Sequence, residues 1–129
     1  MSRPLTALAL LALLVTVSLA SAEVTITSPT PGQVVGPSTP IRGTVSERAF
    51  LVIYSDVFRE NGEHIGMVPG IRHWSNDDNT ITVRIATPRL FALPDERLRY
   101  EINVKAYSSP DRAGEAPDLG EVKITVYSQ

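Results

Sequence analysis

The sequence predicts an all-β protein built as a two-layer antiparallel β-sandwich of about seven strands. Three observations lead to this prediction. Apolar and polar residues alternate over short stretches, as is typical of half-buried strands. Turn-forming residues separate these stretches at short intervals. None of the 129 residues is a cysteine, so the sandwich is expected to have no disulfide and to be stabilised by a packed core or a bound ion.

Seven stretches are expected to form strands, and most of them show a two-residue period. In the stretch 100–106, for example, apolar residues at even positions alternate with polar ones. The stretch 50–54 is apolar on both faces, which predicts a strand in the interior of a sheet. The expected strands span residues 24–27, 41–45, 50–54, 64–68, 81–85, 100–106 and 122–126.

Two of these strands contain a glycine, Gly43 in one and Gly66 in the other, and glycine lowers strand stability or marks a bulge. No segment shows an apolar stripe with the period of a helix. The best helical candidate, residues 89–98, contains Pro94 near its middle. We therefore expect at most one helical turn there, capped by Asp95.

Asn61-Gly62 is the clearest turn signal in the sequence. Both residue types tolerate positive backbone φ, which predicts a type I′ turn. This turn is expected to join the strand at 52–58 to the strand at 64–68 in a hairpin.

Four prolines near the start of the predicted domain indicate an irregular first strand. Proline has no amide hydrogen and is confined to sheet edges, first positions and connections. We expect a strand that leaves one sheet edge and then rejoins the fold. The prolines are Pro29, Pro31, Pro37 and Pro40.

Residues 1–22 have the pattern of a secretory signal peptide. Arg3 precedes an apolar run over residues 7–15, and small residues at 20–22 predict cleavage before Glu23. The alternative, an uncleaved membrane anchor, calls for a longer apolar core. We expect one exported domain, residues 23–129, in the periplasm or outside the cell, with no stable membrane insertion after signal cleavage.

The net charge of the chain at pH 7 is −2. Nucleic acids attract basic patches, so a mildly acidic chain is not expected to bind nucleic acid.

The run ITSPTPGQVV, residues 26–35, followed by PIRGTV, residues 40–45, resembles the opening of bacterial immunoglobulin-like domains. It is most similar to the immunoglobulin-like domain attached to sporulation and spore-germination proteins. YEINVKAYSSPD and GEVKITVYS in the final third fit the same pattern, whereas residues 69–98 depart from it. The resemblance implies an immunoglobulin-like sandwich that acts as a non-catalytic binding or spacer domain. It carries over no functional residues.

The segment 70–79 is expected to be a loop, and its composition is the most unusual in the chain. It holds the only tryptophan, next to an arginine and a cluster of polar residues. Aromatic and arginine side chains dominate binding hot spots, which favours a contact with a protein or an envelope polysaccharide. In the alternative, the tryptophan folds inward as a lid on the core. The candidate binding residues are Arg72, His73, Trp74, Asn76, Asp77 and Asp78.

Metal and catalytic chemistry are not expected. Residues 76–79 supply the hard oxygen atoms that calcium takes, but such residues are also ordinary turn material, so calcium stays an open alternative. His64 and His73 are too few for a transition-metal site. The hydrolase, zinc-protease and phosphate-loop motifs are absent from the sequence. We expect no cofactor and no enzymatic activity.

Two further polar groups lie near the end of the chain. The outward face of the last two strands is expected to be either a flat protein-binding surface or an ordinary solvated face. Its residues are Arg99, Glu101, Lys105, Tyr107, Lys123 and Tyr127. An acidic group is expected in a solvated connection between these strands, at Asp111, Glu115, Asp118 and Glu121.

These features predict an exported, non-catalytic binding module of the cell envelope or extracellular space that recognises a protein or envelope polymer through loops. Two alternatives stay open. Arg72-His73-Trp74 is similar to the Arg-Pro-Trp loop of cysteine-free, immunoglobulin-like inhibitors of papain-like proteases, although His73 replaces the proline and their glycine-rich loop is missing. The domain can also be a structural spacer whose edge strands pair with another chain.

Overall fold

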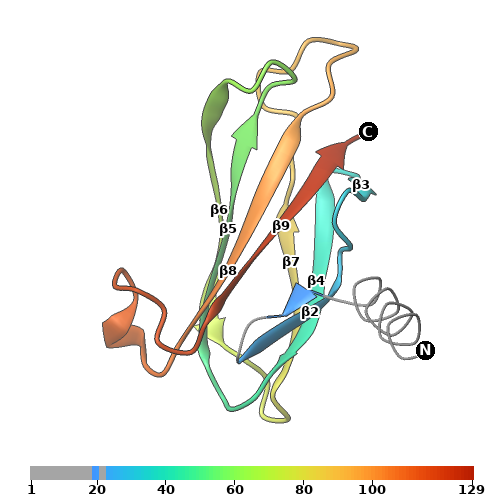
Figure 1. Cartoon of the computed structure of the whole chain (residues 1–129). Helices are drawn as coiled ribbons and strands as arrows, with labels where there is room; N and C mark the ends of the chain where they lie inside the picture. The colour runs from blue at the N-terminus through green and yellow to red at the C-terminus, as the bar shows by residue number, and fades with distance from the viewer. Residues whose placement is uncertain (1–18, 21–22) are drawn as a thin grey trace, which may run out of the picture.

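The computed structural model describes residues 19–20 and 23–129, whose strands form two facing sheets (Figure 1). One sheet has the order β1-β2-β4-β7 and the other the order β3-β9-β8-β5-β6. Of the predicted signal peptide, the structure describes only Leu19 and Ala20. The strands are β1 (Leu19–Ala20), β2 (Val24–Ser28), β3 (Val34–Val35), β4 (Ser38–Val45), β5 (Phe50–Phe58), β6 (His64–Trp74), β7 (Thr80–Ala86), β8 (Arg99–Tyr107) and β9 (Glu121–Ser128).

The predicted fold class is confirmed: the described chain is an all-β sandwich without cysteine. Strands β2-β4-β7 face β9-β8-β5-β6, which matches the A-B-E and G-F-C-C′ sheets of immunoglobulin-like domains. All seven expected strands are present, as β2 and β4 to β9, and the two-residue strands β1 and β3 are additional. Within the described residues the one helix is η1 (Pro110–Arg112), and no helix is long and apolar enough to cross a membrane.

The core lies between the sheets and is mostly aliphatic. Every second residue of β5 is buried, and β4 and β9 show the same alternation. Full burial of one aliphatic side chain stabilises the fold by about 1.5–3 kcal/mol. The core includes Ile41, Leu51, Ile53, Ile81, Ile102 and Ile124, each no more than 1% exposed.

The proline-rich segment carries the chain from one sheet to the other, so the predicted departure and return are confirmed. After β2, the chain crosses to the second sheet, where β3 pairs in parallel with the end of β9. The chain then returns to the first sheet as β4. Pro40 lies in β4 beyond the reach of β2, whose pairing ends with Ser28 opposite Arg42.

The turn between β5 and β6 differs from the predicted type I′ turn. Gly62 has a φ of 91°, but Asn61 does not have a positive φ, which a type I′ turn requires. The amide of Gly62 donates to the carbonyl of Arg59 at 2.9 Å, and that of Arg59 donates to Glu63 at 2.8 Å. These bonds define a three-residue loop in which only the last residue is left-handed.

Strand β6 extends six residues beyond its predicted end at Val68. The prediction that residues 70–79 form a loop is therefore wrong for residues 70–74. Pro69 and Gly70 lie inside this strand. Proline is tolerated here because β6 is the edge strand of its sheet. Gly70 is a bulge: Ile53 pairs with Ile71 and Tyr54 with Pro69, which leaves Gly70 without a partner.

The segment between β7 and β8 contains no helical turn, and Asp95 caps none. Instead, the amide of Glu96 donates to the carbonyl of Leu93 at 3.0 Å in an isolated turn around Pro94. Proline lacks the amide hydrogen that a continuing helix needs.

We expect Gly70→Ala to destabilise the protein by about 1–3 kcal/mol, the usual cost of an overpacked site. A Cβ atom at this position would lie 2.1 Å from the carbonyl oxygen of Ile53, so the two strands would have to separate. Gly66→Ala, in the same strand, is the matched control, because its Cβ would meet nothing within 4 Å. Urea unfolding followed by circular dichroism measures both changes. Equal unfolding midpoints for the two variants would contradict the account of the bulge.

Candidate functional site

Strand β5 is apolar on both faces, but only one face is covered. Its inward residues are buried against the other sheet, whereas Phe50, Val52 and Tyr54 on the outward face stay partly exposed. Their partners in β6 are Trp74, Arg72 and Pro69. Directly paired residues project from the same face of a sheet. We call this surface the outer face, and its residues are Phe50, Val52, Tyr54, Met67, Pro69, Arg72 and Trp74.

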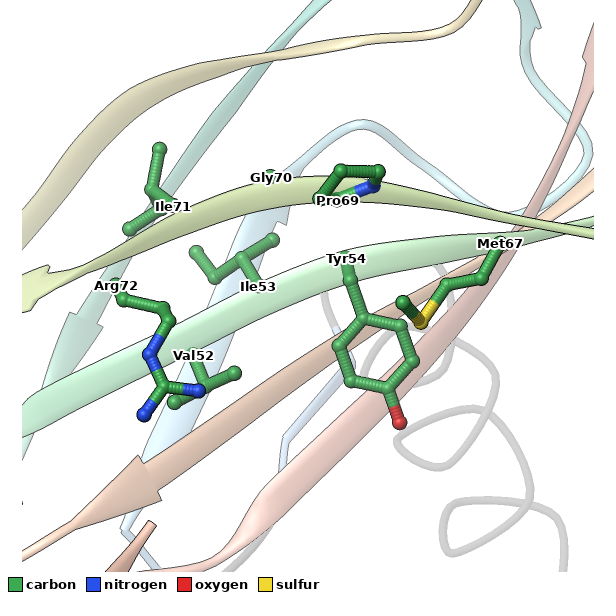
Figure 2. Close-up of a pocket in the computed structure, with 8 residues that line it drawn as sticks. All are labelled: Val52, Ile53, Tyr54, Met67, Pro69, Gly70, Ile71 and Arg72. Atoms are coloured by element: carbon green, nitrogen blue, oxygen red, sulfur yellow. The ribbon is translucent and has the colours of Figure 1, made fainter. Parts of the chain in front are cut away.

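An apolar groove of about 290 Å³ crosses the middle of the outer face. Figure 2 shows Arg72 alongside Val52, and Tyr54 alongside Met67. Met67 is 57% exposed, an unusual fraction for a large apolar side chain in a strand. The groove is lined by Val52, Ile53, Tyr54, Met67, Pro69, Gly70, Ile71 and Arg72.

Two cations flank the groove. Val52 lies between Arg72 of β6 and Lys105 of β8, since it pairs with both. The ammonium of Lys105 lies 5.3 Å from the centre of the Tyr54 ring. A hydrogen bond with the Tyr54 side chain raises the pKa of Lys105, so the ammonium stays charged at neutral pH. The groove therefore has an apolar floor with two cations near Val52, whereas Asp56, the partner of Met67, brings a carboxylate to its other end.

Trp74 lies at one end of the outer face. The alternative that its ring folds inward over the core is therefore wrong. Its ring meets the ring of Phe50 edge to face, with 5.8 Å between centroids and an interplanar angle of 79°. The guanidinium of Arg48 lies 5.1 Å from the Trp74 ring centre and 3.8 Å from a carboxylate oxygen of Asp77. Trp74 remains 36% exposed. This packing fixes the ring in place while one part of it faces solvent.

The side chains of Arg72, His73 and Trp74 do not lie on one face of β6. Arg72 and Trp74 belong to the outer face, but His73 pairs with Leu51 and therefore projects from the opposite face of β6. A ring nitrogen of His73 lies 2.9 Å from the carbonyl oxygen of Trp74. The strand geometry thus separates three side chains that the expected loop would have presented together.

Asn76 and Asp78 build the turn between β6 and β7. Asp78 accepts hydrogen bonds from the hydroxyl of Thr80 at 2.5 Å and from its amide at 3.2 Å. Asn76 donates to the same hydroxyl at 3.0 Å. Asn79 takes the left-handed position with a φ of 64°, as Gly62 does in the other loop. The turn itself accounts for these polar side chains.

In the part of the chain that the structure describes, no three His, Asp or Glu side chains are grouped closely enough to hold a metal ion. The Oδ1 atom of Asp78 accepts both hydrogen bonds from Thr80. The Thr80 hydroxyl and amide hold the pKa of Asp78 below its ordinary value of 3.8.

The second predicted surface, on β8 and β9, is interrupted. Tyr107 was expected to face outward, but it is only 2% exposed because the connection after β8 covers it. Its hydroxyl donates to the carbonyl of Glu115 at 3.1 Å. Asp111, Glu115 and Asp118 lie in the expected connection, where the amide of Ser108 donates to Asp118 at 3.0 Å. For Glu121 the prediction is wrong, because Glu121 is the first residue of β9 and pairs with Lys105. Arg99 lies over Phe58, 4.4 Å from the ring centre, and pairs with Glu101 at 3.5 Å.

Sequence reasoning identified Arg72 and Trp74 but missed Val52, Tyr54 and Met67, which line the groove. The signal was present in residues 50–54, which are apolar at odd and even positions alike. Such a strand supplies the core with one set of side chains and a surface with the other.

We expect the Asp78 carboxyl to titrate below pH 3.8, because its ionised form accepts two hydrogen bonds. A depressed folded-state pKa means that this turn contact is fully present above the unfolded pKa and is lost as pH falls through the folded value. The amide shift of Thr80, followed by NMR, reports the midpoint. Thr80→Val removes the hydroxyl donor and should raise the midpoint of the Asp78 titration. A midpoint at or above 3.8 in the unmodified protein would contradict this assignment.

No family model matches this sequence, and no curated protein matches it significantly.

Proposed function

We propose that this protein is an exported, non-catalytic binding module of the cell envelope or extracellular space, and that the outer face of β5 and β6 is its contact surface for a protein partner. The observation that carries the proposal is the apolar groove bordered by Arg72 and Lys105, with Met67 more than half exposed beside it. Interface cores are rich in aromatic residues, Met and Arg, the residue types found here.

Several features favour a protein over an envelope polysaccharide. Val52, Met67 and Pro69 give the groove an aliphatic character, whereas sugars need convergent polar groups beside an aromatic ring. The packing of Trp74 between Phe50 and Arg48 resembles the fixed aromatic anchors of protein interfaces. The resemblance of the chain to the immunoglobulin-like domain of sporulation and spore-germination proteins supports the same class of function.

Of the two alternatives, the protease inhibitor is not favoured. An inhibitory loop would present neighbouring side chains together, whereas His73 and Trp74 leave opposite faces of an edge strand. The spacer alternative is compatible with the same surface, since a structural subunit also needs a contact face.

We expect Met67→Asp to abolish capture of the partner from the envelope fraction of the source organism, because a carboxylate would have to be buried in the apolar groove. Trp74→Ala should weaken capture by at least tenfold, as hot-spot aromatics do. Thr82→Asp places the same charge on an exposed position of β7 in the other sheet and is the matched control. Affinity purification with quantitative mass spectrometry compares the three variants with the wild type.

Equal loss in the Thr82→Asp variant, or no loss in the Met67→Asp variant, would overturn the assignment of the contact surface.

A further inference from the structure

Strand β7 is an edge strand of its sheet, so one side of its backbone has no partner strand. On the other side it pairs with β4 without a register shift. At the two ends of this pairing, the amide of Thr87 donates to Pro37 and the amide of Val45 donates to Asn79, both at 2.9 Å. Hydrogen-bonded and non-bonded pairs alternate in an antiparallel ladder. The odd-numbered residues of β7 therefore bond to β4, and the even-numbered residues point their backbone groups away from it.

The turn before the strand uses the backbone groups of the first even-numbered residue, Thr80. Its amide donates to Asp78 at 3.2 Å, and its carbonyl accepts from the amide of Asn76 at 3.0 Å. In the part of the chain that the structure describes, no hydrogen bond engages the backbone groups of the next three even-numbered residues. They are Thr82, Arg84 and Ala86, and all three are exposed. Such a row of unpaired groups is a template for pairing with another strand.

The edge of β7 lacks the features that protect the edge of β6. Residues 80–86 contain no proline, no glycine and no bulge, whereas β6 has Pro69 and the bulge at Gly70. The one charged side chain of β7 belongs to Arg84. Its guanidinium donates to the hydroxyl of Ser38 at 3.0 Å, so it lies toward β4 and leaves the edge open.

Apolar side chains beside this edge are covered only in part. Strand β6 packs against β7, and Val68 and Ile71 of β6 project inward, since their partners in β5 are buried. Both stay partly exposed, as does Val83 of β7. In immunoglobulin domains strand D pairs with strand E. Strand β7 takes the position of strand E, and no strand of the described residues takes the position of strand D.

We infer that the edge of β7 binds an extended segment of a partner protein as an additional strand, in the position of strand D. Arg84 and Ala86 present their donors and acceptors about 6.8 Å apart, twice the rise of one strand residue. Another strand offers the same repeat, whereas a lipid or a sugar does not. Apolar side chains at alternate positions of the segment would cover Val68, Ile71 and Val83. This contact is separate from the outer face and goes beyond the proposed function.

Amide hydrogen exchange, followed by NMR, tests whether the edge is open. We expect the amides of Val83 and Ile85 to exchange at least about tenfold more slowly than those of Thr82 and Arg84, because only the first two bond to β4. Equal protection of all four amides in dilute protein would overturn the inference. Protection of Thr82 and Arg84 that appears only as the protein concentration rises would identify a second copy as the occupant and overturn the choice of a partner segment.

A synthetic peptide with the sequence of β9, EVKITVYS, is the probe for strand addition, since its apolar and polar residues alternate. We expect saturable chemical-shift changes centred on the amides of Thr82, Arg84 and Ala86. A control peptide with proline at its third and fifth positions keeps the apolar side chains but lacks two amide donors. It should bind about fivefold more weakly or less, since each hydrogen bond contributes to affinity.

Two variants of one residue separate the backbone from the side chain. Arg84→Pro removes an outward amide without removing a bond to β4, and an edge strand tolerates proline at such a position. It should abolish the shifts caused by the peptide. Arg84→Ala, the matched control, keeps the amide and should retain them. Circular dichroism confirms that both variants are folded, and the comparison of the two peptides decides if Arg84→Pro is not.

The two proposals fail separately, because Arg84→Pro leaves the outer face unchanged and Met67→Asp leaves the backbone of β7 unchanged. Peptide-induced shifts that centre on another part of the sandwich, equal shifts with both peptides, or no shifts at millimolar peptide would overturn the inference.

Discussion

The structure depends on one constraint in β5: the strand carries apolar side chains on both faces, and the sandwich can cover only one of them. The inward set, including Leu51 and Ile53, is fully buried between the sheets and holds together a domain that has no disulfide. The outward set, with Val52 and Tyr54, stays partly exposed beside the side chains of the edge strand β6. Burial of apolar surface is the main favourable term in folding and in association alike. The same strand thus contributes to stability through one face and leaves apolar side chains exposed on the other, which is the surface we propose for binding.

The local irregularities of β6 shape that surface. The bulge at Gly70 lets Pro69 and Ile71 take up positions opposite adjacent residues of β5, and bulges commonly redirect side chains at sheet edges. Pro69 removes a hydrogen-bond donor from the edge strand, which discourages unspecific pairing with other strands. An edge that avoids strand addition can still bind a partner through its side chains.

Much of the fold was predictable from the sequence, because a two-residue period reports directly on which side of a sheet a residue lies. The end of β6 was not predictable, because Pro69 and Gly70 disrupt a central strand but are tolerated at an edge, and edge positions are set by the whole sheet. The burial of Tyr107 was not predictable from its strand either. The alternation placed its side chain on the outward face, but residues later in the chain form the connection that covers it. Asn61-Gly62 identified the hairpin correctly, but the loop has three residues and only the last, Gly62, is left-handed. Asn79 takes the same position in the loop between β6 and β7. At the site, Arg72 and Trp74 were predicted from composition, whereas Met67 and Tyr54 needed the strand register.

An NMR titration with N-acetyl-phenylalaninamide measures whether the outer face of β5 and β6 accepts an apolar side chain. The methyl group of Met67 and the amides of the two strands serve as reporters. We expect chemical-shift changes confined to the groove, at Val52, Tyr54, Met67 and Arg72, with β4 and β7 unchanged. Shifts that centre on another part of the sandwich, or reporters in the groove that stay unchanged up to the solubility limit of the probe, would contradict it.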